Sequence, residues 1–283
     1  MVARARPLGR LTNTWLIGLA ALVWTTGFTL PVSPGREEPL SGFDAPPAPH
    51  ALLHVGERLT FHGHWMGIPV GSGWIEVKEL TRLDGRPVYH IEAQGRSNAV
   101  LSAFYPVEDI LHSYLDAATL QPLRFEKSQR EGRYRAEEEV TFDYQRQIAT
   151  YHSRLNGSTK DIPIPHDVQD IISAFYWLRT RTIDPRQPLS LNIYSDERVY
   201  TTTIQPHKME ILELLRRGTF PCVVLEPLAA FKGVFVKRGR LWCYFSADAT
   251  RTPLLVKCAT PWGLMTGVLD AQSLPSTTLA QAD

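Results

Sequence analysis

The stretch Y-R-A-E-E-E-V-T-F-D-Y, residues 134–144, alternates between two kinds of side chain. Its even positions are apolar or aromatic, as at Ala136, Val140 and Phe142, with Glu138 as the exception. Its odd positions are all charged or polar. Successive side chains of a strand point to opposite faces, so this alternation predicts a strand with one face buried.

The same period of two recurs through the chain from residue 51 onward. Turn pairs such as Asp84-Gly85 and Asn156-Gly157 separate the alternating stretches, and the connections are short, which favours antiparallel neighbours. The predicted strands are 58–65, 74–80, 88–94, 123–127, 134–144, 148–152, 189–194, 198–205, 220–226, 234–237, 241–245, 254–258 and 264–270.

One stretch has the period of a helix instead. Apolar residues recur at intervals of three and four over 168–178, and Asp167 is a suitable N-cap for this helix. A shorter helix is predicted over 98–104, ended by Pro106.

These elements predict a mainly β fold. We expect a curled antiparallel sheet (an open barrel, half-barrel or β-spiral) with one amphipathic helix packed on it, and a sandwich is the alternative. A curled sheet with a helix against it tends to enclose an apolar cavity.

The first fifty residues have a different composition. Arg4, Arg6 and Arg10 precede an uncharged apolar run over 15–30, and six prolines follow within 31–50. This layout predicts a Sec-type signal peptide over 1–30 or an uncleaved inner-membrane anchor, then a linker over 31–50. A single domain over 51–272 and a polar tail over 273–283 complete the expected organisation. The expected location is therefore the periplasm.

Charge excludes one class of partner. The chain has 30 Lys+Arg and 29 Asp+Glu, and without residues 1–50 it has 26 of each sign. A nucleic-acid binder would show a basic excess, so no nucleic-acid partner is expected. With 43% hydrophobic residues the chain has enough apolar material for a core.

Few residues form patterns typical of catalysis or metal binding. His62 and His64 share one face of a strand, as metal ligands do, but a polar strand face explains them equally. Glu138 lies on the face of Val140 and Phe142 and is the one unusual acid of its run. Known catalytic motifs are absent from the sequence, and Gly71-Ser72-Gly73 is a turn or bulge rather than a nucleophile elbow. We therefore expect no catalytic residues, no metal and no cofactor.

The three cysteines leave three alternatives open. A hairpin around residues 247–252 would place residue 243 opposite 257 or 258, so Cys243 and Cys258 would be positioned for a disulfide in an oxidising periplasm, leaving Cys222 unpaired. Cys222 is an alternative partner, and three reduced, buried thiols are the other reading.

Several stretches resemble a family of exported bacterial proteins known only as domain of unknown function 3108. The stretches that carry the resemblance are W-M-G-I-P-V-G-S-G at 65–73, R-F-E-K-S-Q-R-E-G-R-Y at 124–134, D-V-Q-D-I-I-S-A-F-Y-W-L-R at 167–179, Y-S-D-E-R-V-Y at 194–200, G-T-F-P-C-V-V-L-E-P at 218–227 and G-R-L-W-C-Y-F-S-A-D at 239–248. The resemblance implies an address in the bacterial envelope and implies no activity.

These observations favour a non-enzymatic envelope protein that binds a hydrophobic small molecule or lipid inside its curled sheet. The alternatives are an envelope-integrity protein that contacts a protein partner without a small ligand and, ranked lower, a hydrolase of envelope polymers. The aromatic residues expected to line a ligand site are Trp65, Phe142, Phe175, Trp177 and Trp242.

Overall fold

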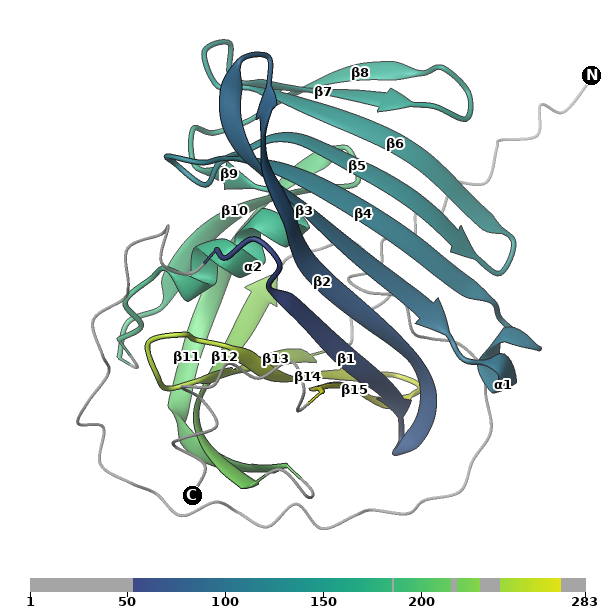
Figure 1. Ribbon diagram of the computed structural model, residues 1–283, viewed down its shortest axis with the longest axis vertical. Helices are drawn as coiled ribbons and strands as arrows, with labels where there is room; N and C mark the ends of the chain where they lie inside the picture. The colour runs from purple at the N-terminus through teal and green to yellow at the C-terminus, as the bar shows by residue number, and fades with distance from the viewer. Residues whose placement is uncertain (1–52, 185, 215–217, 230–239, 271–283) are drawn as a thin grey trace, which may run out of the picture.

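The computed structural model describes residues 53–270, except 185, 215–217 and 230–239. This part of the chain forms one fifteen-stranded sheet and two helices (Figure 1). The elements are β1 (Arg58–Trp65), β2 (Ile68–Leu83), β3 (Arg86–Ser97), α1 (Ala99–Ser102), β4 (Val107–Asp116), β5 (Pro122–Glu131), β6 (Tyr134–Asp143), β7 (Ile148–Ser153), β8 (Thr159–Pro163), β9 (Val168–Gln169), α2 (Ile171–Arg179), β10 (Leu189–Ser195), β11 (Arg198–Leu214), β12 (Gly218–Ala229), β13 (Arg240–Ser246), β14 (Pro253–Thr260) and β15 (Gly263–Leu269).

The sheet consists of two meanders, one from β1 to β8 and the other from β10 to β15. The two meanders are joined where β1 pairs with β15. Its strand order runs from β8 back to β1, then to β15, and back again to β9. Strands β1 and β15 pair antiparallel, with Phe61 opposite Leu269 and Gly63 opposite Gly267. Every pairing is antiparallel except that of β9 with β10.

The sheet curls until its two edges approach each other without closing. The edges are β8 and β9, which are only four residues apart in the chain. Side chains bridge the two halves: Phe142 meets Tyr194 edge-on at 5.6 Å between ring centroids, and Lys160 pairs with Glu197 at 3.2 Å. The predicted curled antiparallel sheet with a packed helix is therefore confirmed.

Glycines allow the strong curvature of the first strands. Gly63 lies opposite both Gly71 and Gly267, and Gly73 lies opposite Gly95. A Cβ added to Gly73 would lie 2.7 Å from the backbone oxygen of Gln94. Only a residue without a side chain permits this close approach, and glycine positions of this kind bend sheets. Gly71 and Gly73 both lie inside β2. Beside them, the register of β1 with β2 shifts between Gly63 and His64.

Helix α2 fills the centre of the curl (Figure 1). The Oδ1 atom of Asp170 accepts hydrogen bonds from the backbone N–H groups of Ile172 and Ser173, and the Ser173 hydroxyl bonds the Asp170 N–H in return. The helix thus begins three residues later than its apolar stripe predicts, because Val168 and Gln169 pair with β10 as a strand. Phe175 packs against all three apolar clusters of the core.

Several sequence predictions differ from the structure in detail. Strand β4 was not predicted, because the polar Asp109 and Ser113 occupy buried positions in its alternating pattern. The short helix is confirmed as α1, capped by Asn98. The strand predicted over 234–237 and the N-terminal segments over 1–50 lie outside the described residues. No helix of the described part is long and apolar enough to cross a membrane.

A buried ion pair fixes α2 to the rest of the fold. The Arg179 guanidinium donates two hydrogen bonds to the Glu57 carboxylate, at 2.9 and 2.8 Å, and a further one to the carbonyl oxygen of Thr250. The Arg179 side chain is 1% exposed and that of Glu57 13% exposed. This pair links the end of α2 to the start of β1 and to the β13–β14 connection.

We predict that Glu57→Ala lowers the free energy of unfolding by about 3–5 kcal/mol, because it leaves the Arg179 charge buried without its partner. Urea unfolding measures this change. Lys160→Ala, which breaks an exposed pair, is the control and should cost less than about 1 kcal/mol. Equal effects of the two substitutions would contradict the role given to the buried pair.

Candidate functional site

The inner face of the curled sheet has two different walls beyond α2. Cross-strand partners share a face, so the register assigns each inner side chain. Both walls extend toward the end of the sheet that carries α1 and the β1–β2 turn (Figure 1). One wall is apolar and the other is polar.

The apolar wall belongs to β13, β14, β15 and β1. Its side chains lie on the same face as Leu225, which packs against α2, but most of them are only half-buried. Gly267 lies in the middle of this wall, and a Cβ added there would meet no atom within 4 Å. There is therefore open space above Gly267. Its residues are Leu241, Cys243, Val256, Cys258, Gly267, Phe61 and Trp65.

The polar wall belongs to β4, β5 and β6. The Gln129 amide donates to Asp109 Oδ2 and to Glu131 Oε1, both at 3.4 Å, and all three side chains are buried. The Oε1 atom of Gln129 is buried without a hydrogen-bond partner in the described structure. Burial, with the neighbouring Asp109 carboxyl, raises the pKa of Glu131 to about 9. Glu131 is therefore protonated at neutral pH.

A buried lysine lies beside these acids. Lys127 pairs with Glu138 at 2.8 Å and with Asp196 at 3.2 Å. Burial acts to lower the pKa of Lys127, but the two carboxylates outweigh it and the pKa is raised. The unusual Glu138 of the sequence thus neutralises a charge inside the curl and joins β6, through Lys127, to β10–β11.

The five aromatic residues predicted to bind a ligand do not converge. Phe142 and Phe175 are packed into the core around α2. Trp177 and Trp242 lie under the guanidinium groups of Arg181 and Arg240, respectively. Only Trp65 lies at the end of the apolar wall, where its Nε1–H donates to the carbonyl oxygen of Trp262. Their role in binding stays a prediction.

The apolar wall itself was not identified from the sequence. Its strands were predicted, but the pairing of β1 with β15 joins residues more than 200 positions apart, such as His62 and Val268. The signal that was available is the mainly apolar composition of residues 254–258 and 264–270. That composition does not reveal which strand lies beside β1.

The predicted disulfide is wrong in this structure. All three cysteines are free thiols. Cys243 lies opposite Val256, whereas Cys258 lies opposite Leu241, so the two cysteines are two residues out of register. Burial raises the pKa of Cys222 and of Cys243 to about 12, so both thiols stay protonated at neutral pH.

Two of the polar residues considered for chemistry, His62 and Glu138, have structural partners. His62 contacts Asp270 at 2.8 Å on the outer face, and Glu138 pairs with Lys127. No group of three or more metal-ligating side chains occurs in the described ranges.

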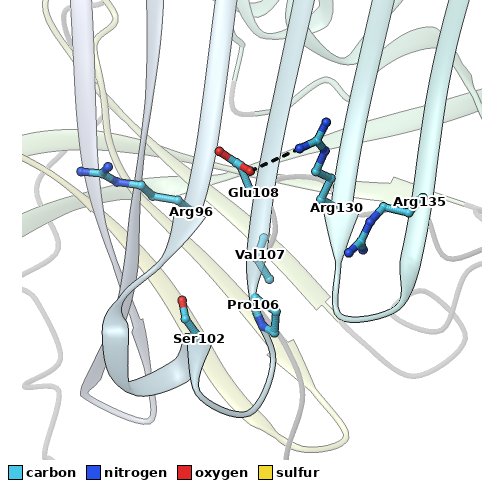
Figure 2. Close-up of a pocket in the computed structure, with 7 residues that line it drawn as sticks. All are labelled: Arg96, Ser102, Pro106, Val107, Glu108, Arg130 and Arg135. Carbon is cyan, nitrogen blue, oxygen red and sulfur yellow. Dashed lines mark ion pairs between the residues drawn. The ribbon is translucent and has the colours of Figure 1, made fainter.

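A second feature is a basic pocket on the outer face of the sheet. Arg96, Glu108, Arg130 and Arg135 lie opposite one another in turn on β3, β4, β5 and β6. Together with Ser102, Pro106 and Val107 they line a pocket of about 410 Å³. Figure 2 shows Glu108 directed toward Arg130, with Arg96 and Arg135 on the two flanking strands. The ion pair of Glu108 with Arg130 measures 3.9 Å and both side chains are more than half exposed.

Residues 60–270 match the family described as Protein of unknown function (DUF3108). The chain belongs to this family. No curated protein matches it in sequence. Among solved structures, it resembles the β-barrel-like protein of the domain of unknown function DUF1849 from Brucella abortus, with a TM-score of 0.50 and 10% identity, over 77% of this chain and 97% of that one. This likeness supports the β-barrel-like fold and nothing finer.

The protonated carboxyl of the polar wall gives the DUF3108 chain a specific pH dependence. The ordinary pKa of a glutamate is 4.5, and that of Glu131 is about 9 in the folded protein, where Asp109, Asp196 and Lys127 act on it. A raised pKa of this kind stabilises at low pH, and the contribution is lost as pH rises from about 4.5 toward 9.

We predict that Glu131→Gln makes the free energy of unfolding less dependent on pH between 5 and 8. The difference between variant and wild type should grow in favour of the variant by up to about 1.4 kcal/mol per pH unit. Urea unfolding at several pH values measures it. Glu213→Gln, at an exposed position of β11, serves as control and should retain the wild-type dependence. Parallel curves for Glu131→Gln and wild type would disprove the assignment.

Proposed function

We propose that this protein is a non-enzymatic protein of the bacterial cell envelope that holds a hydrophobic ligand, such as a lipid, inside its curled sheet. The observation that carries the proposal is the half-buried apolar wall of β13–β15 and β1, with open space above Gly267. Apolar surface left half-exposed inside a curl gains free energy when a hydrophobic ligand covers it.

The polar wall suits the other end of an amphiphile. Asp109, Gln129 and Glu131 share the inner face with the apolar wall, and the orphan Gln129 Oε1 accepts no hydrogen bond from the described protein. An acyl chain along the apolar wall would leave its polar head near these groups. A buried unsatisfied acceptor has a free-energy cost that a ligand donor removes.

A binding role agrees better with the polar groups than a catalytic role does. Glu138 is committed to Lys127, His62 to Asp270, and the buried Cys222 thiol is held in its unreactive protonated form. A catalytic centre needs convergent titratable groups beside a substrate site.

The proposed location in the envelope is supported by the charged start and apolar run over residues 1–30, which would act either as a cleaved signal or as an anchor.

A protein partner is the second candidate, favoured by the open edge of the sheet at β8. Among the described strands it pairs only with β7, and four of its five residues are exposed. Unpaired edge strands accept an added strand from another protein.

We predict that Gly267→Leu weakens binding of a fluorescent fatty acid such as cis-parinaric acid by at least about tenfold, which is about 1.4 kcal/mol. The leucine would occupy the open space above the apolar wall. Gly267 lies in a strand and outside the left-handed region, so the substitution should not strain the backbone. Fluorescence titration measures the affinity, and native mass spectrometry of the purified full chain identifies any co-purifying lipid.

Thr266→Leu is the matched control. It places the same leucine side chain at the preceding residue, on the opposite face of β15, where Thr266 lies opposite His64 and Lys257. Wild-type affinity in this control and loss in Gly267→Leu would support the inner site. Equal affinity in all three proteins would reject it.

A further inference from the structure

Exposed apolar side chains gather at one end of the sheet. The described residues include eleven large apolar side chains that are exposed, and six of them lie on three neighbouring segments at this end. Phe104 and Val100 are the most exposed, at 78% and 69%. We call this set the apolar rim: Met66 and Ile68 at the β1–β2 turn, Val100 and Phe104 at α1, and Trp262 and Leu264 at the β14–β15 turn.

Hydrogen bonds fix the three segments to one another. The Met66 N–H donates to the carbonyl oxygen of Leu264 at 2.7 Å, and Trp65 Nε1 donates to that of Trp262 at 3.1 Å. Asn98, the cap of α1, donates its side-chain amide to the carbonyl oxygen of Pro69 at 2.8 Å. These hydrogen bonds hold the three segments of the rim together. Figure 1 shows them at the same end of the strands, at the lower right of the view.

The basic pocket adjoins this rim. Ser102 and Pro106, at the end of α1 and just after it, line the pocket, and Arg96 is on the strand that leads into α1. Arg130 lies directly opposite Arg135, an arrangement of like charges that destabilises a sheet. Arg96 makes no ion pair in the described structure. Glu108 is the one acid that lines the pocket, and Arg130 also pairs with Glu137 at 4.0 Å, so three arginines face two acids.

The combination selects one kind of partner. Scattered exposed apolar residues are ordinary, but a contiguous set marks a binding surface. Tryptophan and aliphatic side chains enter the interface of a bilayer, and arginines beside them bind lipid phosphates. The basic excess is local, because the chain beyond residue 50 has no net charge.

We propose that this end of the sheet docks on an anionic lipid surface, with the apolar rim in the headgroup region and a lipid phosphate in the basic pocket. This inference goes beyond the proposed function, because docking needs no ligand inside the curl. It also places the open end of the apolar wall, at Trp65, against the membrane.

Quenching of tryptophan fluorescence by brominated phosphatidylglycerol tests the rim locally. The full chain is mixed with these vesicles, and wild type is compared with Trp262→Phe. Residues 1–50 are the same in both proteins, so the difference in quenched emission reports Trp262 alone. We expect the wild type to lose more emission than the variant. Equal losses would overturn the proposal, because Trp262 would then lie away from the lipid.

Vesicle co-sedimentation tests the pocket. Wild type should bind vesicles containing phosphatidylglycerol at least about tenfold more strongly than vesicles of phosphatidylcholine alone. The triple variant R96Q/R130Q/R135Q should lose this preference, whereas Arg146→Gln, on an exposed turn, should keep it. Loss of the preference in both variants, or in neither, would overturn the pocket assignment.

Two further variants separate this inference from other outcomes. Phe104→Ser should reduce vesicle binding. Leu155→Ser, which changes another exposed apolar side chain but on the β7–β8 connection, should not. If Phe104→Ser changed only the recovery of a co-purified envelope protein, the rim would be a protein interface and the proposal would fail. Gly267→Leu should bind vesicles as wild type does, so failure of docking and failure of the inner ligand site give different results.

Discussion

The pairing of β1 with β15 is the constraint on which the rest of the structure depends. It joins the first and last strands of the described sheet, and the two meanders extend from it in opposite directions. Both far edges are then formed by neighbouring residues, β8 and β9. The sheet must curl for these edges to approach each other, and the glycines at Gly63, Gly71 and Gly267 permit the curvature where the meanders meet.

The curl creates an interior that apolar side chains alone do not fill. Helix α2 occupies its centre, and its Arg179 is neutralised by Glu57 at the start of β1. Lys127 is neutralised by Glu138 from its own half and Asp196 from the other. Each buried cation thus joins segments that are distant in the chain. A buried pair contributes little net stability over apolar packing, but losing one partner is costly, so these pairs specify how the halves meet.

Local sequence patterns predicted most of the strands and helices, but they did not predict which strands pair over long distances in the chain. The period of two identified most strands and the period near 3.6 identified α2, because each reports one buried face. Strand β4 was not predicted because two of its buried residues, Asp109 and Ser113, are polar. Their hydrogen-bond partners, Gln129 and Asp170, lie elsewhere in the chain. The cysteine pairing failed because it was placed two residues too far along β14: Cys243 lies opposite Val256, and Cys258 lies opposite Leu241.

The candidate site was harder to predict than the fold because it consists of inner side chains that are not packed into the core. Aromatic residues such as Phe142 and Phe175 attract notice in the sequence, yet the fold places them in close packing around α2. The open surface is centred instead on Gly267, with Gly63 and Val256 on the two neighbouring strands, and of the predicted aromatics only Trp65 lies at its end. A ligand site in a curled sheet requires space, and space arises where side chains are short. A glycine does not contribute to the hydrophobic pattern of a sequence. Only the strand pairing shows that Gly267, Gly63 and Val256 form one surface.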